Sequence, residues 1–138
     1  MHQPVINEAL FNKPLRYIGM AKKAGLLAIG SEAVKAAARA RQIKLVLTAT
    51  DISTGSARQA RYNAEDSKAI YVETPYTKFE LGNIAGRGSP GTLAFLDLGF
   101  AAGFMKCLTA LNKEKYEEPA ELITKRMESQ KAKRRTNI

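Results

Sequence analysis

Four short apolar segments alternate with segments of helical character along this chain. They are residues 26–29 (LLAI), 44–50 (KLVLTAT), 69–74 (AIYVET) and 92–97 (TLAFLD). Short runs rich in Leu, Ile, Val and Thr that lie between turn-forming residues are typical of buried strands. Strands that alternate with helices predict an α/β fold, in which helices cover both faces of a central sheet.

The ends of the first helix are marked by residue type. Residues 13–25 (KPLRYIGMAKKAG) form the helical pattern, and Asn12 or Lys13 would precede it. Pro14 suits the first turn of such a helix, and Gly25 suits its end. We therefore expect the helix to begin next to Pro14.

Besides a helix from Ser31 to Arg41, three further helices are indicated before residue 112. Residues 51–66 begin with turn residues and continue as a helix. Thr77 and Glu80 stand three apart before an apolar run, which is the signature of a capping box. Asp97 is placed to cap the apolar helix 98–111 (LGFAAGFMKCLTAL).

The composition changes after Asn112. Residues 113–138 are dense in charge, and Pro119 is a candidate start for a helix within them. That helix has a thin apolar stripe of Leu122, Ile123 and Met127. We therefore predict one α/β domain over residues 1–112, which is long enough to bury a core, and a charged, partly helical basic tail over 113–138.

The charge of the chain points to a polyanionic partner. There are 22 Lys and Arg against 13 Asp and Glu, for a net charge of +9. Both residues 1–112 and residues 113–138 carry a basic excess, so the tail alone does not explain it. A small basic domain suggests a polyanionic partner, most often nucleic acid, although a basic surface that only aids solubility is the open alternative.

Several kinds of protein are disfavoured. No apolar run is long enough to span a bilayer, and the first twenty residues do not have the pattern of a secretory signal. Cys107 is the single cysteine and His2 the single histidine. With one cysteine and one histidine, the chain is not expected to contain an internal disulfide, a metal site of Cys and His, or a Ser/His/Asp or Cys/His catalytic set. We expect a cytoplasmic monomer without cofactor, metal or enzymatic activity.

Residues 86–91 (GRGSPG) match the dinucleotide-binding pattern G-x-G-x-x-G by letter. In that motif the loop follows a strand and opens a helix, whose N-terminus faces the pyrophosphate. Here the loop follows a helix and precedes a strand, and Pro90 removes a backbone donor. A helix stop with a turn explains the segment better, and a glycine loop with an arginine can also lie against an RNA backbone.

The helix predicted from Ser31 to Arg41 has two distinct faces. Ser31 is a good N-cap, and Glu32, Lys35 and Arg39 cluster on the polar face. The opposite face is made of small apolar residues: Ala33, Val34, Ala37, Ala38 and Ala40. A helix N-terminus attracts phosphate, and Glu32 can accept hydrogen bonds from base amino or imino groups. An ordinary capped surface helix with an i,i+3 Glu–Lys pair is the alternative.

From about residue 15 to residue 104 the chain resembles the L-seven-Ae/L-thirty-e ribosomal-protein family of kink-turn RNA binders, and its small bacterial ribosome-associated members in particular. Four segments support the resemblance in the order of the family: IGMAKKAGLLAIGSEAV, IKLVLTATDIS, LGNIAGRG and AFLDLGFA. The resemblance implies a three-layer α-β-α sandwich around a mixed four-stranded sheet. It also implies that RNA is held from two places, the start of the helix at Ser31 and the loop before the last strand.

Three positions depart from the family pattern. Glu32 stands where Asn is usual, Ala33 where Glu is usual, and Ala36 where Lys is usual. Lys35 is next to the expected lysine position but is turned about 100° from it around the helix. Because Ala33 and Ala36 have no hydrogen-bonding groups, the chain lacks two of the side chains that read kink-turn bases in the family.

The leading hypothesis is therefore non-enzymatic binding of structured RNA, kink-turn-like or ribosomal, with ribosomal proteins as further possible partners. The candidate RNA-binding residues are Gly30, Ser31, Glu32, Lys35, Arg39, Arg87, Gly88, Ser89, Pro90, Lys22 and Lys23. An auxiliary basic set lies in the tail: Lys131, Lys133, Arg134 and Arg135. The alternative is a protein-interaction module that has kept the fold and lost kink-turn recognition.

Overall fold

The computed structural model describes residues 7–136, so the predictions about His2 lie outside the described residues. The element order is α1 Glu8–Lys23, β1 Leu27–Ile29, α2 Ser31–Arg39, β2 Leu45–Thr48, α3 Thr54–Ser67, β3 Ile70–Glu73, α4 Lys78–Ala85, β4 Thr92–Phe95, α5 Leu98–Leu111 and α6 Lys113–Thr136. All four strands predicted from the sequence are present, and each lies within its predicted segment.

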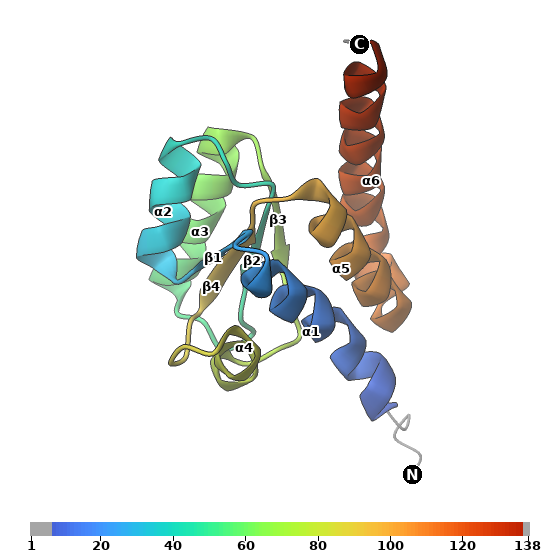
Figure 1. Ribbon diagram of the computed structural model, residues 1–138. Helices are drawn as coiled ribbons and strands as arrows, with labels where there is room; N and C mark the ends of the chain where they lie inside the picture. Colours follow the sequence, from blue (N-terminus) through green and yellow to red (C-terminus); the bar gives the residue numbers. More distant parts are fainter. Residues whose placement is uncertain (1–6, 137–138) are drawn as a thin grey trace.

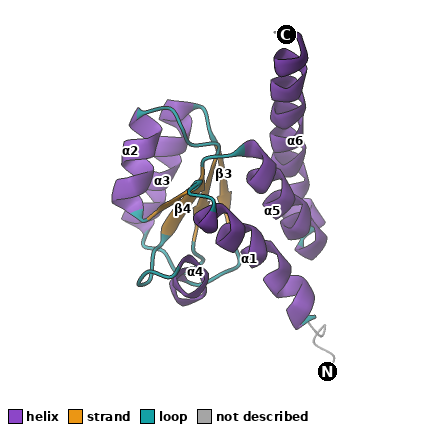
Figure 2. Cartoon of the chain, in the orientation of Figure 1, coloured by secondary structure: helices purple, strands orange, loops and turns teal. Residues whose placement is uncertain are grey.

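The four strands form one mixed sheet in the order β1-β4-β2-β3. Strand β4 runs antiparallel to both β1 and β2, whereas β2 and β3 are parallel. Helices α2 and α3 cover one face of the sheet, and α1 and α5 cover the other (Figures 1 and 2). The α-β-α sandwich around a mixed four-stranded sheet is therefore confirmed.

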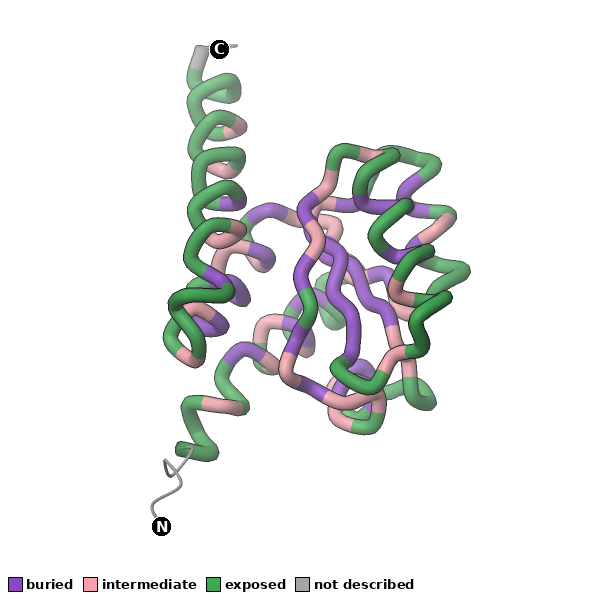
Figure 3. The backbone as a smooth tube through the Cα atoms, turned by 180° about the vertical axis from the view of Figure 1, so that it is seen from behind, coloured by how far each residue is buried: buried purple, intermediate pink, exposed green. Residues whose placement is uncertain are grey.

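The two faces of the sheet bury side chains of different size. Leu45, Leu47 and Phe95 belong to the cluster that also holds α1 and α5, whereas Val46 and Ala94 face α2 and α3. Successive strand residues point to opposite faces, which produces this division. The strands are buried along most of their length (Figure 3). The small side chains let α2 pack close to the sheet.

Helix α1 begins five residues earlier than the sequence pattern predicts. The Asn7 side chain accepts hydrogen bonds from the backbone N–H groups of Ala9, at 3.0 Å, and Leu10, at 3.4 Å. Pro14 consequently lies inside the helix, where its missing N–H leaves the Leu10 carbonyl without its usual donor. The prediction of a start next to Pro14 was wrong because the asparagine cap lies upstream.

Helix α6 also begins earlier than predicted, at Lys113 in place of Pro119. The Asn112 side chain accepts a hydrogen bond of 3.2 Å from the backbone N–H of Lys115, which starts the helix there. Ile123 is fully buried against α5 and the sheet. The proximal half of α6 is thus packed on the domain, and the independence of residues 1–112 stays a prediction.

Candidate functional site

The N-terminus of α2 has no side-chain cap. Its N-cap is Gly30, and the prediction that Ser31 caps the helix was wrong, since Ser31 is the first helical residue. Gly30 has φ 91° and ψ 161°, a backbone region that is essentially restricted to glycine. Its N–H donates to the carbonyl of Thr92 at 2.9 Å. The amides of the first helical turn have no intrahelical acceptor, so they face outward with the positive end of the helix dipole.

The outer surface of α2 combines charged residues with bare alanines. Glu32 and Arg39 are exposed and Lys35 is half-buried. Val34, Ala37 and Ala38 are buried as predicted, but Ala33 and Ala40 are exposed, contrary to the predicted apolar face. The buried stripe is therefore narrower than predicted. Ala36 is exposed as well.

The loop from Gly86 to Gly91 is held against α4 by close backbone packing. Gly86 and Gly88 have φ values of 71° and 40°, in the left-handed region. The N–H of Gly86 donates to the Gly82 carbonyl at 2.8 Å and ends the helix. A Cβ atom on Gly82 would overlap the carbonyl oxygen of Gly88. The loop therefore has a defined path, with Arg87, Gly88 and Ser89 exposed and Pro90 half-buried.

The loop and the start of α2 meet at the beginning of β4. Thr92 follows the loop directly, and its carbonyl accepts the Gly30 N–H. The residue before Thr92, Gly91, accepts a hydrogen bond of 2.9 Å at its carbonyl from the backbone N–H of Ala49, which follows β2. The structure thus brings together the two segments that the sequence analysis selected. We call the exposed surface of residues 30–39 and 86–90 the α2–loop surface.

The two candidate lysines at the end of α1 are placed differently. The Nζ atom of Lys22 lies over Gly86, where a Cβ atom would contact it. Lys22 therefore extends the α2–loop surface toward α1. Lys23 is exposed in the last turn of α1, without a described contact to the loop or to α2.

A polar cleft of about 290 Å³ lies between α2 and α3, beside the α2–loop surface. We call it the α2–α3 cleft; it is lined by Ser31, Glu32, Lys35, Gly55, Ser56, Gln59, Ala60, Asn63 and Thr92. The residues that α3 contributes to the cleft were not predicted from the sequence. The only sequence signal was a cluster of small and amide residues at the start of a helix, which is also typical of an ordinary turn.

The tail residues do not join this site. Lys131, Lys133, Arg134 and Arg135 lie in the distal half of α6. That end of the helix is on the opposite side of the molecule from the loop between α4 and β4 (Figure 1). A partner held at the α2–loop surface must extend well beyond it to reach the tail.

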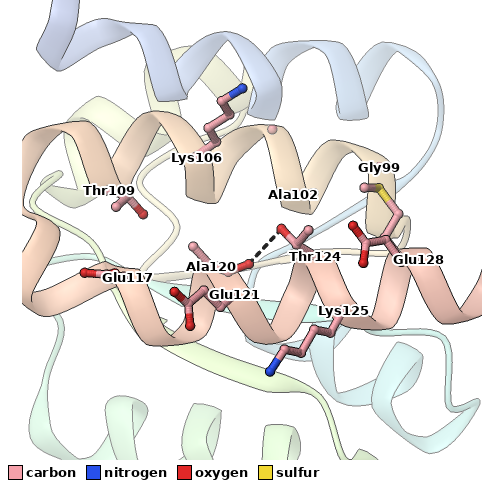
Figure 4. Close-up of a pocket in the computed structure, with 12 residues that line it drawn as sticks. Gly99, Ala102, Lys106, Thr109, Glu117, Ala120, Glu121, Thr124, Lys125 and Glu128 are labelled. Atoms are coloured by element: carbon pink, nitrogen blue, oxygen red, sulfur yellow. Dashed lines mark hydrogen bonds between the residues drawn. The ribbon is translucent and has the colours of Figure 1, made fainter.

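A second hollow, of about 700 Å³, lies between α5 and α6 (Figure 4). Gly99, Ala102 and Gly103 of α5 line it together with Met127 of α6. It lies apart from α2 and the loop. Within residues 7–136, no group of three His, Cys, Asp or Glu side chains is arranged to hold a metal ion. In the same part of the chain, every helix is too short or too polar to cross a membrane.

Comparisons with known proteins support the fold class. Neither a family model nor a curated protein sequence matches this chain. The described sheet and its helices are shared with solved structures at low sequence identity, which establishes the architecture.

One such structure is a protein of unknown function from Bacillus halodurans, with a TM-score of 0.63 and 21% identity, covering 70% of this chain and 96% of that one. Another is the 15.5kD RNA binding protein of Giardia lamblia, with a TM-score of 0.57 and 16% identity, covering 78% of this chain and 91% of that one.

Proposed function

We propose that this chain binds structured RNA, without catalysis, through the α2–loop surface. The observation that carries the proposal is the junction at β4, where the hydrogen bond from Gly30 to Thr92 sets the open N-terminus of α2 beside the exposed loop of Arg87. Helix-end amides bind phosphate oxygens, and Lys35, Arg39 and Lys22 add positive charge around them. The family resemblance and the fold shared with the RNA-binding protein of Giardia lamblia support the same proposal.

Within this proposal the side chains have separate roles. Arg39, Arg87 and the lysines contact phosphates and position the RNA. Glu32 is the side chain on α2 that can read a base, by accepting hydrogen bonds from amino and imino groups. A kink-turn or another sharply bent RNA, including a ribosomal one, fits a site made of a helix end and an adjacent loop.

A second candidate function is protein interaction on the same fold. Ala33 and Ala36 are both exposed on α2, at positions where the family that this chain resembles has hydrogen-bonding side chains. A surface of this kind can pack against another protein. Binding to RNA that is equal for a kink-turn and a plain duplex, and that disappears with salt, would favour this candidate.

The deciding experiment compares two RNAs and two charge-matched variants. Affinity for a kink-turn RNA and for a plain duplex is measured over a salt series with the parent chain, with Lys35→Ala/Arg39→Ala, and with Lys106→Ala/Lys113→Ala. Lys106 and Lys113 are exposed on α5 and α6, away from the α2–loop surface. We expect the first variant to lose kink-turn affinity at least tenfold and the second to lose less than about threefold, since removal of distant charges acts only through the general field. Equal losses from both variants would remove α2 from the interface.

A further inference from the structure

Helix α6 carries one regular row of exposed polar side chains along most of its length. The members of the row recur every three or four positions: Glu117, Glu121, Thr124, Glu128, Lys131 and Arg135. Residues at this spacing lie on one face of a helix. Three of the first four members are acidic and the last two are basic, so the charge of the row changes sign along the helix. We call this set the α6 row.

The acidic part of the α6 row forms one wall of the hollow between α5 and α6 (Figure 4). All members of the row from Glu117 to Glu128 line this hollow, which has a volume of about 700 Å³. The other lining residues include the small Gly99, Ala102 and Gly103 of α5 and the lysines Lys106 and Lys125. Small side chains allow a further helix to approach α5 closely. The hollow is therefore a groove that can hold a helix, with acidic side chains along one edge.

The basic part of the α6 row lies beyond this groove. The last turns of α6 extend past the rest of the domain (Figure 1), and both Lys131 and Arg135 are exposed. Within one chain these residues do not reach the acidic members of the row. Lys131 is ten residues from Glu121, or about 15 Å along the helix, and Arg135 is eighteen residues from Glu117, or about 27 Å. Opposite charges in the row are therefore available to a second molecule.

We propose that two copies of this chain pair through antiparallel α6 helices, each lying in the groove between α5 and α6 of the other copy. In this arrangement Glu117 of one copy faces Arg135 of the second, and Glu121 faces Lys131. Both pairs belong to one register, because both are centred on residue 126. A two-fold axis repeats each pair, so four ion pairs form in the dimer. A parallel arrangement would place Glu against Glu along the row, so charge favours the antiparallel one.

The change of sign within the row favours a second copy over other occupants of the groove. A basic peptide would pair only with the acidic part of the row, and a nucleic acid only with the basic part, whereas a second copy pairs with both. The net charge of +9 makes two copies repel each other. Salt screens that repulsion over about 8 Å, so it weakens the distant charges more than the facing pairs. Exposed ion pairs contribute little each, so we expect a weak dimer.

This dimer differs from the monomer expected from the sequence. It is also independent of RNA binding, because α6 and its groove lie apart from the α2–loop surface.

The test is sedimentation velocity of the full chain without RNA, at protein concentrations from about 10 µM to about 1 mM, the range of a weak dimer. One variant, Glu117→Lys/Glu121→Lys, makes the charged ends of the row basic, and another, Lys131→Glu/Arg135→Glu, makes the whole row acidic. We expect each variant alone to self-associate at least tenfold more weakly than the parent, because like charges face each other. A mixture of the two variants should form a heterodimer at least as tight as the parent dimer, because every facing pair regains opposite charges.

The variant Lys131→Glu/Arg135→Glu separates local pairing from net charge. It lowers the net charge from +9 to +5, since each substitution changes the charge by −2. General repulsion alone would then predict stronger self-association, the opposite of what we expect.

The matched control is Glu65→Lys/Asp66→Lys, which makes the same charge change as Glu117→Lys/Glu121→Lys at exposed positions of α3. The control should stay within about threefold of the parent, since it adds only general repulsion. All substituted residues are exposed, and circular dichroism checks that each variant keeps the fold. An equal loss of self-association in the control and in Glu117→Lys/Glu121→Lys would remove α6 from the interface and overturn the proposal.

A pair of cysteine variants tests the antiparallel direction. A mixture of the Glu121→Cys chain and the Lys131→Cys chain should form a disulfide-linked dimer under mild oxidation, because these positions face each other. The Glu121→Cys chain alone should not, since its two cysteines would lie about 15 Å apart along the pair. Cross-linking of Glu121→Cys alone would show a parallel pair and contradict the proposal. A parent chain that stays monomeric at every concentration would overturn it too, as would a mixture of the two charge variants that associates no better than either variant alone.

Discussion

The hydroxyl of Tyr116 donates a hydrogen bond of 2.6 Å to the carbonyl oxygen of Glu73. Tyr116 lies in the first turns of α6 and is 3% exposed, whereas Glu73 ends the edge strand β3. The bond joins residues that are 43 positions apart and attaches α6 to the sheet. The helix that begins the charged segment is therefore part of the packed structure.

Replacing Tyr116 with Phe tests this attachment. The change removes one buried hydrogen bond and leaves the ring in place, so we expect the free energy of unfolding to fall by about 1 kcal/mol. Urea denaturation measures the change. Tyr62→Phe is the control, because Tyr62 is 60% exposed and should leave the unfolding midpoint unchanged. Equal effects of the two substitutions would show that the bond to Glu73 contributes nothing.

Tyr116 and Tyr76 should also make the fold sensitive to alkaline pH. Burial, followed by the charge of Glu73, raises the pKa of Tyr116 to about 12 from its ordinary 10.0. Burial raises the pKa of Tyr76 as well. Above pH 10 the unfolded chain loses these protons and the folded chain keeps them, so stability is full below pH 10 and falls as the pH rises toward 12.

Absorbance of tyrosinate near 295 nm and circular dichroism, recorded together from pH 9 to 12, check this prediction. Part of the tyrosinate signal should develop only as the helices unfold. In Tyr116→Phe the loss of stability between pH 10 and 12 should be shallower than in the parent chain. A chain that titrates all its tyrosines near pH 10 without unfolding would contradict the expectation.

Two glycines near helix starts provide a matched pair. At both Gly30 and Gly55 a Cβ atom would meet no other atom within 4 Å. Only Gly30 has a glycine-restricted backbone conformation, with φ 91°. We expect Gly30→Ala to cost about 1–3 kcal/mol of stability and to weaken RNA binding by displacing the start of α2. Gly55→Ala should be neutral or slightly stabilising.

Thermal unfolding and kink-turn affinity of the two glycine variants give the comparison. A Gly30→Ala chain as stable as Gly55→Ala would mean that the backbone at the start of α2 adapts freely. The N-terminus of α2 would then not be a preorganised binding element, and the proposed phosphate site would lose its structural basis.

Gly82 should control the loop that follows α4. A Cβ atom at Gly82 would overlap the Gly88 carbonyl oxygen and lie 3.1 Å from Pro90 Cδ. We expect Gly82→Ala to push the loop away from α4, which lowers RNA affinity at least fivefold. Amide exchange of residues 86–91 should rise, while that of the central strands stays protected. Unchanged affinity in a variant with a displaced loop would exclude Arg87 and its neighbours from the RNA interface.

The fold could be predicted from the sequence because the capping residues and the pattern of apolar residues agree in most elements. The Thr77–Glu80 capping box is present as predicted, and Asp97 accepts a hydrogen bond of 2.9 Å from the Phe100 N–H to start α5. The starts of α1 and α6 were predicted wrongly because proline suggested a first turn, whereas Asn7 and Asn112 cap both helices further upstream.

The candidate site could be predicted only in part from the sequence. Periodicity selected α2, and the glycine pattern selected the loop, but neither contains information about which helix lies beside α2. The packing of α3 against α2 adds Gln59 and Asn63 to the same surface. Asn63 in particular has no sequence signature, since its burial depends on how α3 packs against α2 and the sheet.

A final prediction concerns the basic end of α6, and the packing of that helix determines at which residue a truncated chain should end. Removal of residues 119–138 would delete Ile123, which is fully buried. A loss of stability could then not be separated from a loss of RNA contacts. Ending the chain after Glu128 removes four basic residues, Lys131, Lys133, Arg134 and Arg135, and retains both Ile123 and Met127. We expect this truncated chain to keep its unfolding midpoint. Its affinity should fall by the same factor for a kink-turn RNA and for a duplex of equal length, because tail charges contact phosphates without reading bases.

The salt dependence of binding separates this role from a specific one. The slope of the logarithm of affinity against the logarithm of salt concentration should become shallower by up to roughly 3 in the truncated chain. Helix α6 has 24 residues and is therefore about 36 Å long. Its C-terminal end lies opposite the α4–β4 loop (Figure 1), so the effect should disappear with a kink-turn RNA whose arms are too short to pass around the domain. A truncation that changes the preference between kink-turn and duplex would instead place the tail among the residues that distinguish one RNA from another.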